Sequence, residues 1–224
     1  MTFKIDLEIP KKRSSRLLIL KEITKSAIRK LYAEDKFLLE KGVKEISIAH
    51  KLANCYSHFI SGLSIDIEYN RKGLNPEPKI LTDFYEIFTI IEKNKIPENL
   101  TKVIKKLFGE ETNIKKITQK INKEFTNLKE KINKNKIKKI IPDIIIHSRG
   151  INDNNLIAIE LKKYGKPEAI FCDIVKLYFL RKDYEYKHAV FINFLTKQRK
   201  YEAYWIIYKK DNNIIDFCKE NHKL

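Results

Sequence analysis

The hydrophobic pattern changes its period near residue 139, and this change most restricts how the 224-residue chain can fold. Before it, apolar residues recur at steps of three and four from Ile114 to Ile132, as they do along one face of an α-helix. After it, two β-rich runs at 140–148 and 156–162 are joined by a polar, turn-forming loop at 149–154. The pattern therefore predicts a long helix followed by a β-hairpin.

The other periodicities extend this order in both directions. An amphipathic helix is predicted over 35–60, with Asp35 as its N-cap, and an alternating strand over 65–70. After the hairpin, helical spacing returns over 167–180, followed by two strands at 187–195 and 201–208. Because a helix lies between strands, we expect an α/β fold in which a mixed β-sheet is flanked by helices.

The length fits a single domain, 1–224, that contains a helical insertion at 81–139. Short helices are expected around 84–91 and 100–107, the second closed by Gly109, before the long helix from Ile114. The narrow apolar stripe of that long helix leaves three arrangements open. It packs on the core, pairs with another helix of the insertion, or meets a second protomer.

The chain is strongly basic, with 46 Lys and Arg against 29 Asp and Glu, a formal net charge of +17. Such an excess favours polyanionic partners such as nucleic acid. The residues from 93 to 139 hold fifteen Lys and five Glu, so much of the excess lies in the insertion. A solvated lysine-rich helix surface is the alternative explanation.

No membrane association is expected, since the apolar runs are far shorter than a membrane span. The N-terminus does not have the pattern of a signal peptide. The three cysteines, Cys55, Cys172 and Cys218, are scattered and follow no zinc-binding spacing. They are expected to be reduced thiols that fill space in a cytoplasmic protein.

Charged residues stand at the ends of the two strands of the predicted hairpin. Pro142-Asp143 begins the first strand, and Glu160-Leu161-Lys162 ends the second. Alternate side chains of a strand share a face, so Glu160 and Lys162 point the same way. The hairpin brings the start of one strand beside the end of the next, and Asp143 should therefore join them.

This grouping is suited to a divalent cation. Carboxylates at the ends of apolar strands are costly to bury without a partner. Mg²⁺ binds one or two carboxylates together with waters and phosphate oxygens, and the backbone carbonyl of Leu161 would complete the protein's share. Lys162 would orient the attacking water and stabilise charge on the phosphate. The alternative is that the same three residues form an ion pair at the surface and have no catalytic role.

Laid out as Pro142-Asp143, sixteen residues, then Glu160-Leu161-Lys162, these positions resemble the PD-(D/E)XK nuclease superfamily. The chain is similar, in particular, to small bacterial nuclease-like proteins. The similarity covers roughly 35–70 and 140–208, and it is carried by segments 45–53, 67–71, 141–147, 154–162, 173–177 and 189–192. It implies a restriction-endonuclease-like core, to which the insertion at 81–139 is a departure.

The resemblance implies roles for further residues. Asp143 and Glu160 would bind Mg²⁺ or Mn²⁺, Lys162 would act on the water, and Glu45 would be a further catalytic acid and a ligand of the same cation. Glu45 also stands on the inward stripe of its predicted helix, although a glutamate reaching out from a helix edge is the alternative. Substrate contacts are proposed for a looser set: His50, Glu68, Tyr69, Asn70, Arg71 and Lys176. For His50 an interface role, and for Lys176 a solvated helix position, are the alternatives.

The function expected from these residues is metal-dependent hydrolysis of phosphodiester bonds, in DNA. The alternative is a non-catalytic module of the same fold that binds nucleic acid or protein through the basic insertion. A homodimer or a protein partner at the insertion is also left open.

Overall fold

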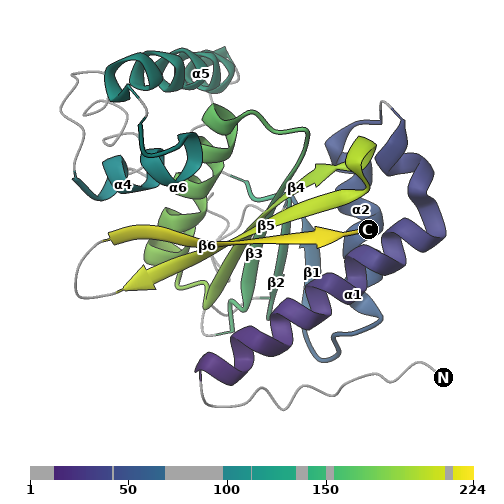
Figure 1. Cartoon of the computed structure of the whole chain (residues 1–224). Coiled ribbons are helices and arrows are strands. Elements are labelled where there is room, and N and C mark those ends of the chain that lie inside the picture. Colours follow the sequence, from purple (N-terminus) through teal and green to yellow (C-terminus); the bar gives the residue numbers. More distant parts are fainter. Residues whose placement is uncertain are drawn as a thin grey trace.

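The computed structural model describes residues 13–41, 43–68, 98–111, 113–134, 141–149, 154–209 and 214–224. Its centre is one six-stranded sheet whose strands lie in chain order (Figure 1). The strands are β1 (Ser64–Ile67), β2 (Ile144–His147), β3 (Ile157–Lys163), β4 (His188–Leu195), β5 (Lys200–Lys209) and β6 (Ile214–Lys223). The predicted α/β class with a mixed sheet is confirmed.

One strand pair differs from the rest. Strands β3 and β4 are parallel, whereas the other neighbouring pairs are antiparallel. A parallel pair requires a crossover connection, and α6 (Pro167–Tyr184) supplies it. The predicted β2–β3 hairpin is confirmed, with Ile144 opposite Ile159.

Helices cover both faces of the sheet (Figure 1). On one face, α1 (Arg13–Glu40) and α2 (Glu45–Ser57) pack with Ile144, Ile146 and Ile159 in one apolar cluster. On the other, α4 (Glu98–Phe108), α5 (Ile114–Lys134) and α6 pack with Ile145 and Ala158. Because strand side chains alternate, each strand contributes to both cores.

The prediction of one helix over 35–60 was wrong. The structure has two helices there: α1 ends at Glu40 and α2 begins at Glu45. Lys44, the residue before α2, has extended backbone angles (φ −63°, ψ 144°). Asp35 is not an N-cap either, since it lies at a kink inside α1 with φ −150° and ψ 56°. The apolar stripe remained in phase across this break, which hid it from periodicity alone.

Two helices of the insertion are confirmed, at Glu98–Phe108 and Ile114–Lys134. Gly109 follows the first with φ 100°, a conformation that glycine adopts readily. The N-terminal half of α5 packs on the core beside α6, where Ile121 is fully buried and Ile117 partly buried. The helix expected at 84–91 lies outside the described residues.

Two strands differ from the prediction. The strand expected over 65–70 ends at Ile67, and Asn70 lies outside the described residues. Strand β6 was not predicted at all. It pairs with β5 along its whole length, from Lys200 opposite Lys223 to Lys209 opposite Ile214. As an edge strand rich in polar residues, it lacks the apolar alternation by which strands are found in a sequence.

Among the residues that the structure describes, no helix has the length and apolar character to cross a membrane. Cys55 and Cys172 are buried free thiols, and Cys218 is exposed, so only the first two fill space in the core.

The packing of α5 on the core can be tested by truncating Ile121. We expect Ile121→Ala to lower the free energy of unfolding by about 2–4 kcal/mol, because it leaves a cavity under α6. The matched change Lys123→Ala, at an exposed position of the same helix, should shift it by less than about 0.5 kcal/mol. Equal effects of the two changes in urea unfolding would contradict the packing.

Candidate functional site

The site lies where β2 begins and β3 ends. One step beyond the paired Ile144 and Ile159, the same register sets Asp143 beside Glu160. A hydrogen bond fixes this arrangement: the backbone N–H of Leu161 donates to Oδ2 of Asp143 over 2.8 Å. The Asp143 carbonyl in turn accepts from the N–H of Glu68 at 3.2 Å, which ties the site to the end of β1.

The three predicted side chains share one face of the sheet. Ile145 and Ala158 belong to the core beneath α6, and Asp143 and Glu160 are two residues from them along their strands. Lys162 is a further two residues along β3. The intervening Ile159 and Leu161 belong to the opposite core. The convergence that strand alternation predicts is therefore present in the structure, while the chemical roles stay predictions.

Helix α6 adds two charged groups that face these residues. Lys176 Nζ lies 2.6 Å from Glu160 Oε1 and 3.5 Å from Asp173 Oδ1. Lys162 Nζ lies 3.2 Å from Asp173 Oδ2. Asp173 therefore stands between the two lysines, and the sheet and α6 form one network of alternating charges.

Glu45 reaches the network from the other helical layer. It is the first residue of α2, and its Oε1 accepts a hydrogen bond from the backbone N–H of Lys163 at 3.2 Å. Its Oε2 lies 3.9 Å from Lys162 Nζ. The side chain is 43% exposed, so Glu45 stands at the rim of the site.

Two carboxylate oxygens in the network are buried without a hydrogen bond from the described residues. They are Glu160 Oε1 and Asp173 Oδ2. Each has an ammonium group nearby that balances its charge: Lys176 Nζ lies 2.6 Å from Glu160 Oε1, and Lys162 Nζ lies 3.2 Å from Asp173 Oδ2. Glu160 is only 3% exposed, so its acceptor is not satisfied by bulk water. Such an atom fits a cation ligand.

The protonation equilibria follow from burial and charge. Burial raises the pKa of the Asp143 carboxyl, although Lys176 and the Leu161 N–H oppose this. Burial also raises the pKa of Glu160 well above its ordinary range, against the pull of Lys176. For Lys162 and Lys176 burial lowers the pKa, but the surrounding carboxylates outweigh it and the net pKa is raised. Both lysines are therefore ammonium ions at neutral pH.

Among the described residues, no three His, Cys, Asp or Glu side chains are grouped so that they could hold a metal ion. Asp143 and Glu160 form a pair, as suits Mg²⁺, which keeps several waters and takes substrate oxygens. Leu161 contacts Asp143 through its N–H, and its carbonyl as a further ligand stays a prediction.

The structure describes only some of the residues that were predicted to contact the substrate. Lys176 is at the site, and it is part of the charge network rather than a solvated residue. His50 is exposed on α2, and Glu68 is exposed after β1 with φ 49°. Tyr69, Asn70 and Arg71 lie outside the described residues.

Sequence reasoning gave no role to Asp173, although it contacts both lysines. Its segment is one of those that carry the family resemblance. A further signal was the i,i+3 spacing of Asp173 and Lys176, which sets both on one side of a helix. The spacing does not predict that this side of the helix docks against β3.

The raised pKa of Asp143 predicts a pH dependence of stability. A carboxyl group whose folded pKa is raised favours folding at acid pH and loses that contribution as pH rises through the raised value. With EDTA present, Asp143→Asn should therefore gain stability relative to wild type as pH goes from about 4 to 7. The amide oxygen can still accept from Leu161 N–H.

Asp66 is the matched control. Arg149 and His147 hold the pKa of Asp66 below its ordinary range, so Asp66→Asn should lose stability relative to wild type as pH rises from about 2 to 4, where this contribution appears. Urea unfolding at several pH values measures both slopes. If the stability of both variants relative to wild type changed in the same direction with rising pH, the assigned pKa shifts would be contradicted.

Comparison of the chain with models of protein families, with curated proteins and with solved structures found no match. The α/β class rests on the six-stranded mixed sheet and its helices. The resemblance to the PD-(D/E)XK nucleases stays a prediction, supported by the type, order and placement of the site residues. The function is therefore argued from the geometry of these residues.

Proposed function

We propose that the protein is a metal-dependent nuclease that hydrolyses phosphodiester bonds, in DNA. The observation that carries this proposal is the grouping of Asp143, Glu160 and Lys162 on one face of a strand pair, with the Glu160 carboxyl group buried beside Lys176. Two acids and a lysine in this arrangement suit a cation, a phosphate and an attacking water.

Asp143 and Glu160 would hold Mg²⁺ or Mn²⁺, with the Leu161 carbonyl as a backbone ligand. When bound, the cation supplies Lewis acidity at the scissile phosphate. The hydrogen bond from Leu161 N–H fixes one Asp143 oxygen and leaves Oδ1 for the cation. Lys176 already neutralises part of the charge on Glu160, so it would share this carboxylate with the cation.

Lys162 would act on the water and on the developing negative charge. Its ammonium group is held 3.2 Å from Asp173, and Glu45 stands at 3.9 Å on the other side. An ammonium group fixed in this way does not have to be reoriented during the reaction. Charges that are positioned beforehand in this manner stabilise a transition state. Asp173 and Glu45 thus serve as positioning residues for Lys162.

Nucleic acid as the substrate is supported by charge. The net charge of +17 attracts polyanions, and counterion release would favour binding to a phosphate backbone. DNA is the proposed substrate, and RNA is an outcome that the experiment distinguishes.

A second candidate function is a non-catalytic binding module that acts through the insertion. It is favoured by one observation: α4 and α5 bury their apolar sides against the core and leave lysines exposed. These lysines are Lys102, Lys105, Lys115 and Lys116. A protein partner, a homodimer contact and a cytoplasmic location also remain proposals.

A nuclease panel tests the first proposal. Plasmid, linear and single-stranded DNA and RNA are incubated with the protein in Mg²⁺, Mn²⁺ or EDTA. We expect cleavage that EDTA abolishes and that Lys162→Ala lowers by about 10²-fold or more, since a preorganised charge is removed. The matched control Lys25→Ala, on α1 in a surface pair with Glu22, should cleave as wild type does.

Intact substrates after incubation of folded wild-type protein with either metal would contradict the nuclease. The binding module would then be favoured if DNA affinity were insensitive to Lys162→Ala and fell when Lys115 and Lys116 were replaced.

A further inference from the structure

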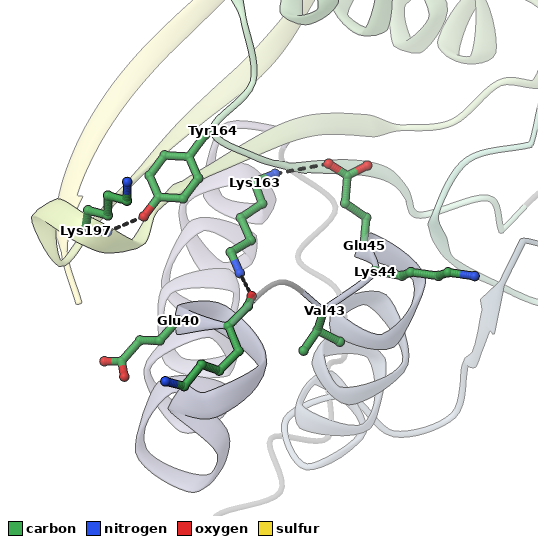
Figure 2. Close-up of a pocket in the computed structure, with 8 residues that line it drawn as sticks. Glu40, Val43, Lys44, Glu45, Lys163, Tyr164 and Lys197 are labelled. Carbon is green, nitrogen blue, oxygen red and sulfur yellow. Dashed lines mark hydrogen bonds between the residues drawn. The ribbon is translucent and has the colours of Figure 1, made fainter.

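A pocket of about 530 Å³ opens beside the site at the C-terminal end of β3 (Figure 2). Its wall combines the end of α1, the start of α2, the turn after β3 and the turn after β4. Four lysines, two glutamates, a valine and a tyrosine line it: Lys41, Lys44, Lys163, Lys197, Glu40, Glu45, Val43 and Tyr164. It shares Glu45 with the site, and Lys163 directly follows Lys162.

The pocket favours an anion despite its two acids. Glu45 is already engaged by the N–H of Lys163 and by Lys162. In Figure 2, Glu40 extends away from the group formed by Tyr164 and Lys163. Lys163 donates from Nζ to the Lys41 carbonyl, which uses one of its three N–H donors. Its positive charge is thus held at the pocket wall.

Tyr164 is presented as a fixed aromatic ring. The residue has φ 55°, a left-handed conformation that is rare for a tyrosine, and it is 39% exposed. Two contacts anchor its hydroxyl group: Thr196 Oγ1 at 2.5 Å and the backbone N–H of Lys197 at 2.5 Å. Lys197 Nζ lies 5.9 Å from the ring centroid.

The turn that carries Tyr164 is also closely packed. A side chain at Gly165 would come within 3.2 Å of Ile170 Cγ1 and 3.3 Å of Asn193 Oδ1. The Gly165 N–H donates to Asn193 Oδ1 at 2.8 Å, and the Tyr164 N–H donates to the Phe194 carbonyl at 3.0 Å. An exposed aromatic residue held in a tight turn between lysines is typical of surfaces that stack nucleobases.

We propose that this pocket binds a single-stranded nucleic acid segment, with Tyr164 stacked on an unpaired base and Lys163 and Lys197 on the backbone phosphates. The inference rests on the proposed nuclease function, because the pocket would hold the strand that runs into the nuclease site. A base inside a duplex has both faces covered by its neighbours, so stacking on Tyr164 requires an unpaired strand.

Binding in EDTA tests this without cleavage. The probe is a fluorescent oligothymidine of about 12 nucleotides, compared with the same strand in a duplex, by anisotropy over a range of salt concentrations. We expect the full-length protein to bind the single strand more tightly. Tyr164→Ala should weaken single-strand binding about fivefold or more, while Tyr164→Phe, which keeps the ring, should lose less.

The lysines are tested through the salt dependence. Lys163→Ala/Lys197→Ala should lower the slope of log affinity against log salt by about 1.4, that is about 0.7 for each phosphate contact to a single strand. The charge-matched pair Lys115→Ala/Lys116→Ala, exposed on α5, should lower it by much less. Circular dichroism and thermal melting confirm that each variant is folded.

The inference is overturned if the duplex binds as tightly as the single strand, or if folded Tyr164→Ala binds as wild type does. It is equally overturned if the α5 pair, rather than the pocket pair, controls the salt slope. Pocket-dependent binding by a protein that cleaves nothing would support this inference and refute the nuclease, so the two failures are distinguishable.

Discussion

Glu160 carries a carboxyl group into the space between the sheet and α6, where it is 3% exposed, and the rest of the site compensates for that burial. An ionised carboxylate there is costly unless positive charge lies near it, and Lys176 lies 2.6 Å away. Lys176 is itself balanced by Asp173, which also holds Lys162. Each charge is thus tolerated because an opposite charge lies next to it. Among the described residues, two carboxylate oxygens of this network, Glu160 Oε1 and Asp173 Oδ2, are buried without a hydrogen bond.

The topology explains why these groups meet. The β2–β3 hairpin sets Asp143 beside Glu160, and the parallel pairing of β3 with β4 requires a crossover helix. That helix is α6, whose docking on the sheet brings Asp173 and Lys176 over the same face. Helix α2 approaches from the opposite layer and adds Glu45 at the rim. The pocket beside Tyr164 adjoins the site at the end of β3, and Glu45 lines both (Figure 2).

The sequence predicted what depends on neighbours along the chain. Alternation within β3 set Glu160 and Lys162 on one face, and the short hairpin added Asp143. The sequence did not predict the role of Asp173, because the contact of Asp173 with Lys162 depends on how α6 docks on the sheet. It missed the break between Glu40 and Glu45 because the apolar stripe continues through it. Strand β6 was missed because an edge strand is stabilised by its pairing with β5 and has little apolar pattern of its own.

The central claim is that Asp143 and Glu160 form one divalent-cation site, and direct counting of bound Mn²⁺ by electron paramagnetic resonance tests it without any substrate. The account predicts Mn²⁺ binding by the wild-type protein that both Asp143→Asn and Glu160→Gln abolish. The matched change Asp216→Asn, at a carboxylate of the edge strand β6 that is paired with Lys106, should leave it intact, because β6 lies three strands away from β3. Wild-type protein that binds no Mn²⁺, or folded Asp143→Asn that binds as much as wild type, would contradict the account.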